Sequence, residues 1–107
     1  MNDAPILFMA RHPARPGIDP AEVWEAAMVC AAFDRRTTVL LLGEAVELLH
    51  GASGVALANA LDAGVEAICI EAAQTGRVAA DCPIPFQSLD ATALRTLLAA
   101  HPIVISV

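Results

Sequence analysis

Cys69 is the residue whose type and position could do chemistry. It lies near the end of residues 65–70, a mainly apolar stretch that we expect to form a buried strand. A helical turn is predicted directly after this strand. Because backbone N–H groups at a helix start stabilise an anion, the pKa of the Cys69 thiol could be lowered there. A thiolate at this position would be a nucleophile able to attack or carry a sulfur atom.

A second interpretation of Cys69 stays open. Free cysteine is among the most buried residue types, so Cys69 could simply pack as a small apolar side chain in the strand. Glu71, two residues further on, favours this interpretation because a nearby carboxylate disfavours a thiolate.

Three basic side chains could stabilise an anion at the same edge of the protein. Arg11 and His12 begin a loop after the first predicted strand, and Arg77 follows the third. The alternative for this loop is an ordinary solvated connection. The remaining cysteines are Cys30, on the apolar face of a predicted helix, and Cys82, in a loop that we expect to be exposed. The chain has no close-set cysteine or histidine pairs and no phosphate-binding fingerprint, so we expect neither a metal site nor a cofactor.

The elements that must position these residues alternate along the chain. Mainly apolar or β-branched stretches predict strands at residues 5–10, 37–42, 65–70 and 103–107, with a short further strand at 86–89. Helical patterns fall at residues 19–33, 44–49, 55–62 and 90–100. Strands that alternate with helices indicate parallel pairing with helices on both faces of the sheet. We therefore predict an α/β fold for the single domain 1–107, a three-layer α/β/α sandwich with a mostly parallel sheet of four to five strands.

Composition narrows the classes of protein to which the chain can belong. The formal net charge is −6, which argues against a direct nucleic-acid binder, since such proteins carry a basic patch. Hydrophobic residues make up 57% of the chain and charged residues only 17%, so we expect some apolar surface to face a partner subunit. No apolar run reaches the roughly 20 residues of a membrane span. Residues 1–5 lack the basic start of a signal peptide, and three cysteines make no disulfide framework, so we expect a cytoplasmic protein.

The chain resembles the DsrE/DsrF-like family, which includes subunits of the Dsr sulfur-oxidation complex and of the Tus relay that thiolates tRNA. The resemblance lies in the order of elements, the Arg-His-Pro loop after the first strand and three further stretches. These are residues 31–34 (Ala-Ala-Phe-Asp), 41–49 (Leu-Leu-Gly-Glu-Ala-Val-Glu-Leu-Leu) and 93–107. It covers nearly the whole chain, and the DsrF/TusC branch is the most similar.

This resemblance implies a five-stranded parallel sheet between helices, in homo-oligomers or in hexamers of mixed subunits. In the family's catalytic subunits, a cysteine at the end of the third strand carries a persulfide. Residues 69–77 match that motif at Cys69, at the aliphatic Ile70 and at the alanines that follow. They differ from it at Glu71 and in the order of the pair Gly76-Arg77.

Two main functions are therefore expected. The first is a sulfur-relay protein, a sulfurtransferase-like carrier that holds sulfane sulfur as a persulfide on Cys69, with Arg11, His12 or Arg77 near the anion. It would exchange sulfur with donor and acceptor proteins. The second is a non-catalytic structural subunit of a homo- or hetero-oligomer of this family, in which Cys69 is a packed thiol. A third alternative is a small-ligand or redox-sensing domain that uses the same crevice at the strand ends.

Overall fold

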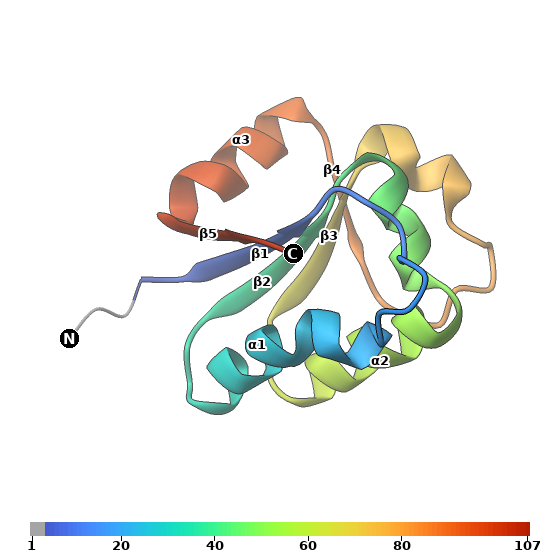
Figure 1. Ribbon diagram of the computed structural model, residues 1–107. Coiled ribbons are helices and arrows are strands. Elements are labelled where there is room, and N and C mark those ends of the chain that lie inside the picture. Colours follow the sequence, from blue (N-terminus) through green and yellow to red (C-terminus); the bar gives the residue numbers. More distant parts are fainter. Residues whose placement is uncertain (1–3) are drawn as a thin grey trace.

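A parallel sheet of five strands forms the middle of the molecule, as the computed structural model of residues 4–107 shows (Figure 1). The strands are β1 (Ile6–Ala10), β2 (Thr37–Leu41), β3 (Ala67–Glu71), β4 (Gln87–Leu89) and β5 (Ile103–Ser106). They lie in the order β4-β3-β2-β1-β5, and every neighbouring pair is parallel. The predicted α/β sandwich is thereby confirmed.

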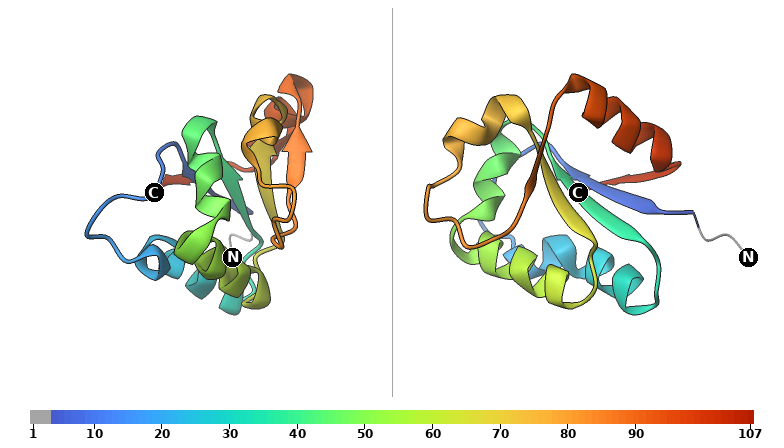
Figure 2. Two further views of the ribbon diagram at one scale, coloured as in Figure 1. Left: turned by 90° about the vertical axis from the view of Figure 1, so that its right-hand side faces the viewer. Right: turned by 180° about the vertical axis from the view of Figure 1, so that it is seen from behind.

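Helical segments cover both faces of this sheet. They are α1 (Pro20–Ala32), η1 (Gly43–Leu49), α2 (Gly51–Asp62), η2 (Ala72–Arg77) and α3 (Ala91–Ala100), of which η1 and η2 are 3₁₀ segments. Helices α1 and α2 lie on one face and α3 lies on the other (Figures 1 and 2). The crossovers β1-α1-β2 and β2-α2-β3 step across the sheet in one direction, whereas α3 carries the chain back from β4 to β5 at the opposite edge.

Two aspartates cap the starts of helices α1 and α3, as the sequence predicts. The Asp19 carboxylate accepts a hydrogen bond from the Ala21 N–H at 2.9 Å, with Pro20 in the first helical position of α1. The Asp90 carboxylate accepts one from the Ala93 N–H at 2.8 Å at the start of α3. Each side chain satisfies a backbone donor that the helix itself leaves free.

One predicted boundary is wrong by a full helical turn. Helix α2 begins at Gly51, although a turn is expected from the glycines of residues 51–54. Gly51 takes a φ of +62°, which lets the chain pass from η1 into α2 with His50 as the only connecting residue. Gly54 then packs so closely on η1 that a Cβ atom would overlap the Leu49 carbonyl oxygen.

The side chains of the strands divide into two apolar clusters, one on each face of the sheet. The cluster on the α1/α2 face is large and includes Phe8, Trp24, Val39, Leu57 and Ile68, all at most 1% exposed. The cluster on the α3 face is small. Its buried members are Leu7, Met9, Leu40 and Cys69, which the partly buried Leu94 and Leu97 of α3 cover.

No helix within residues 4–107 is both long enough and apolar enough to cross a membrane. Residues 1–3, part of the segment 1–5 that bears on the expected absence of a signal peptide, lie outside the described residues.

Candidate functional site

Cys69 lies in the middle of β3 rather than at its end. The strand continues through Glu71, and η2 begins only at Ala72, so the predicted helical turn does not follow Cys69 directly. Cys69 is in register with Leu40 of β2 and Gln87 of β4. Its side chain is 2% exposed and belongs to the apolar cluster on the α3 face. The thiol is therefore part of a small core beneath α3.

Burial raises the pKa of the Cys69 thiol above its usual value. The lowering that a helix start would produce is not found. The physical reason is the position of Cys69, which lies three residues before the start of η2, with its sulfur among leucines and a methionine that cannot solvate an anion. In this arrangement Cys69 is held as a neutral thiol, which is a much weaker nucleophile than a thiolate.

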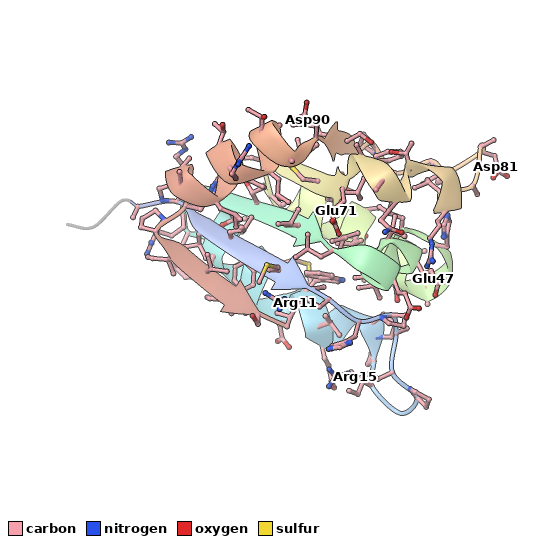
Figure 3. All side chains as sticks on the ribbon, turned by 90° about the horizontal axis from the view of Figure 1, so that it is seen from above. Arg11, Arg15, Glu47, Glu71, Asp81 and Asp90 are labelled. Atoms are coloured by element: carbon pink, nitrogen blue, oxygen red, sulfur yellow. The ribbon has the colours of Figure 1, made fainter. Side chains whose placement is uncertain are left out.

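Glu71 has a structural task at the end of β3. It lies two residues after Cys69 and so on the same face of the strand. Its Oε1 atom accepts a hydrogen bond of 2.7 Å from the N–H of Gly43, the first residue of η1. Gly43 has a φ of +55°, so the carboxylate fixes a turn that only a glycine adopts easily. Figure 3 shows Glu71 two strands away from the loop that carries Arg11 and Arg15.

The three predicted anion-stabilising residues lie on the surface and in different places. Arg11 and His12 are exposed on the loop after β1, and Arg77 is exposed at the last position of η2. Within residues 4–107 none of the three makes a hydrogen bond or an ion pair through its side chain. None belongs to the apolar cluster that surrounds Cys69.

The other two cysteines are free and half-buried. Cys30 packs against the cluster on the α1/α2 face, as its place on the helix predicts. Cys82 is not exposed as expected, because it packs against the same cluster and its Sγ lies 3.8 Å from the Ile84 carbonyl oxygen. In the part of the chain that the structure describes, no three His, Cys, Asp or Glu side chains gather as metal ligands would.

A cavity is present at a different place on the carboxyl edge of the sheet, where β1 and β5 end. It lies beneath the loop of residues 11–19, and His12 lines it together with Arg15 from the same loop and Trp24 of α1. His12 is among the residues that the sequence predicts near an anion, whereas Trp24 lies within the predicted helix 19–33 with no predicted role. The usable signal was the single tryptophan of the chain, placed one turn after the Asp19-Pro20 helix start.

The comparisons with known proteins add no assignment to this geometry. No family model matches the sequence, and a search of curated proteins finds no significant match.

Proposed function

We propose that this chain is a non-catalytic assembly subunit of a sulfur-relay complex of the DsrE/DsrF type. The observation that carries the proposal is the state of Cys69. Its sulfur is buried in mid-strand among apolar side chains, and burial raises its pKa. These are the properties of a packing residue rather than of a persulfide carrier, whose thiolate must meet a donor and an acceptor. The sequence resemblance supplies the sulfur-relay context.

The two edges of the sheet support an assembly role. At one edge β4 is only three residues long and reads Gln-Ser-Leu. At the other, β5 reads Ile-Val-Ile-Ser and leaves Val104 43% and Ile105 39% exposed. Val107, directly after β5, adds further exposed apolar surface. A free strand edge with apolar side chains is a template for pairing with another chain, so the β5 edge is the surface assigned to a partner subunit.

Sedimentation velocity of the purified chain, alone and mixed with candidate companion subunits, tests the assembly role. We expect a complex larger than a monomer, which Val104→Lys disrupts because a lysine would be buried at the contact. Val55→Lys is the control, since Val55 is also an exposed valine but lies on α2. A wild-type chain that stays monomeric in every mixture contradicts the proposal, and so does a complex that both variants leave intact.

A sulfur carrier is the second candidate, and the thin cover over Cys69 favours it. Within residues 4–107, α3 is the one helix that packs side chains against the Cys69 cluster, and none of the residues of α3 is fully buried. If α3 moved away, the Cys69 thiolate would attack the outer sulfur of a donor persulfide. The donor would leave as a thiolate, and Cys69 would hold the new persulfide until an acceptor thiolate took the outer sulfur.

Intact mass after exposure to a polysulfide donor separates the two candidates. For the assembly subunit we expect no added sulfur on Cys69 under native conditions, and the same mass pattern from wild type and Cys69→Ser. A sulfur adduct that appears in the wild type and is absent in Cys69→Ser would instead establish the carrier. Cys30→Ser and Cys82→Ser are the controls for sulfur taken up by the two half-buried thiols.

A further inference from the structure

Strand β5 carries unpaired backbone groups along its outer side. Within residues 4–107 its one neighbour is β1, and Figure 1 shows it at the open edge of the sheet. The Val107 N–H donates to the Met9 carbonyl oxygen at 3.0 Å, so the backbone groups of Val107 point toward β1. Because these groups alternate in direction along a strand, the N–H and C=O groups of Val104 and Ser106 point outward, where the described part of the chain offers no strand to meet them.

The outer side of β5 has none of the features that usually protect a strand edge. Its register with β1 runs without a bulge from Ile103 to Ser106, and it contains no proline and no charged side chain. Its side chains are apolar and partly exposed on both faces of the sheet, with Val104 at 43% and Ile105 at 39%. Strands that remain unpaired usually carry a lysine, a proline or a bulge, so we expect this one to pair with another strand.

The absence of charge on β5 favours a second copy of the chain as its partner. In a two-fold dimer each segment meets itself, so charges of like sign are brought together. In a chain with twelve acidic and six basic residues, many surface segments would oppose acidic side chains in this way. Residues 102–107 carry no charged side chain, so two copies can pair there without that repulsion.

Pro102 determines the register of such a pair. With a two-fold axis at Ile105, Val104 of each copy lies opposite Ser106 of the other, and all of their outward N–H and C=O groups form hydrogen bonds. An axis at Val104 would place Ser106 opposite Pro102, which has no N–H to donate to the Ser106 carbonyl oxygen. Within residues 103–107, an axis at Ser106 would leave the groups of Val104 unpaired.

We propose that two copies of this chain pair through antiparallel β5 strands around a two-fold axis at Ile105, which joins their two sheets into one. Ile105 is in register with Phe8 of the α1/α2 cluster, so the two Ile105 side chains meet on that face. On the same face, Ile103 of each copy lies opposite Val107 of the other. The inference rests on the proposed assembly role and adds the identity of the subunit that occupies the β5 edge.

Disulfide cross-linking of Ile105→Cys tests this arrangement. The variant also carries Cys30→Ser and Cys82→Ser, which remove the half-buried thiols, and is oxidised with glutathione disulfide. Opposed residues of a non-hydrogen-bonded antiparallel pair have Cα atoms about 4.5 Å apart, a distance that a disulfide can span. We therefore expect a covalent dimer on a non-reducing gel.

Val104→Cys in the same background is the matched control. Val104 is as exposed as Ile105, so random collisions would link the two variants equally. In the proposed register the two copies of residue 104 lie about 9 Å apart, which is too far for a disulfide, so we expect about tenfold less covalent dimer. Equal linkage of both variants, or stronger linkage of Val104→Cys, would overturn the proposal.

Sedimentation equilibrium of the wild type alone needs no substitution. Because one pair of short strands makes a small interface, we expect a reversible dimer with a Kd of about 10–100 µM, which Val104→Lys abolishes. A wild-type chain that stays monomeric alone but forms a complex with a companion subunit would overturn this inference and leave the assembly role standing. A chain that stays monomeric in every mixture would contradict both.

Discussion

The two faces of the sheet are built from the same kinds of strand residue but are covered very differently. On the α1/α2 face, two long helices bury side chains as large as Trp24 and Leu57 completely. On the α3 face, a single helix with no fully buried residue covers a cluster of four side chains that includes Cys69. Stability should therefore come mainly from the first face, and access to the interior should be easiest through the second.

The same substitution on each face gives the largest expected contrast. Leu57→Ala in α2 empties a fully buried site and should lower the free energy of unfolding by about 3–4 kcal/mol. Leu97→Ala in α3 removes a half-buried side chain and should cost about 1–1.5 kcal/mol. Urea unfolding of both variants measures the difference. Equal losses would mean that the α3 face is packed as firmly as the other.

A glycine substitution tests how tightly the α1/α2 side is packed. The Cβ of Gly54→Ala would overlap the Leu49 carbonyl group, which is backbone and cannot rotate away, so we expect a loss of about 1–3 kcal/mol. Gly76→Ala in η2 is the control, because nothing lies within 4 Å of its Cβ and its φ is not positive; it should change stability by less than about 0.5 kcal/mol. If Gly54→Ala were neutral, η1 and α2 would have room to move apart.

The two aspartate caps offer a smaller and more specific test. Asp19→Ala and Asp90→Ala each remove one cap hydrogen bond, and each should cost about 1 kcal/mol. Only Asp90→Ala loosens the helix above Cys69, so it alone should accelerate alkylation of Cys69, followed by mass spectrometry of the digested protein. Equal acceleration by both variants would show that Cys69 reacts through global unfolding instead.

The pH dependence of stability should show the smallest effect. Burial raises the pKa of Cys69 above its usual 9.0, so the folded chain keeps the proton at pH values where the unfolded chain loses it. The buried neutral thiol therefore makes its full contribution to the free energy of unfolding below pH 9.0. This contribution falls as the pH rises toward the pKa of the folded state. Above pH 9.0 the stability of the wild type should decline more steeply than that of Cys69→Ala. If the free energy of unfolding fell with pH equally in both proteins, Cys69 would not be a buried neutral thiol.

Local signals in the sequence predict the elements of this fold well. Asp19-Pro20 and Asp90 predict two helix starts correctly, because a helix cap depends only on residues that are neighbours in the sequence. The alternation of strands and helices predicts the parallel sheet, because two neighbouring strands joined by a helix run in the same direction. The start of α2 is harder to predict, since Gly51 reads equally well as part of a turn or as a left-handed residue before a helix.

The surroundings of the candidate residues are decided by contacts between distant parts of the chain. A strand that is buried on both faces is apolar at nearly every position, so its sequence does not show which side chains face which helices. Only the structure shows that Cys69 faces α3, whereas Ile68 and Ile70 face α1 and α2. In the same way, the loop pattern identifies His12, but only the fold brings it to a cavity with Trp24 and Val107. The cavity lies at the ends of β1 and β5, whereas the sequence directs attention to the end of β3.

The pairing of β1 with β5 determines when the sheet can be completed during synthesis. Ile6 of β1 is in register with Thr37 on one side and with Ile103 on the other. The first three strands can assemble as soon as they leave the ribosome, but one side of β1 stays unpaired until α3 and β5 have been made. At about 5–20 residues per second, this interval lasts on the order of seconds. During it, Leu7, Phe8 and Met9 form an open apolar edge, so a nascent chain that stalls before residue 103 is a natural substrate for chaperones.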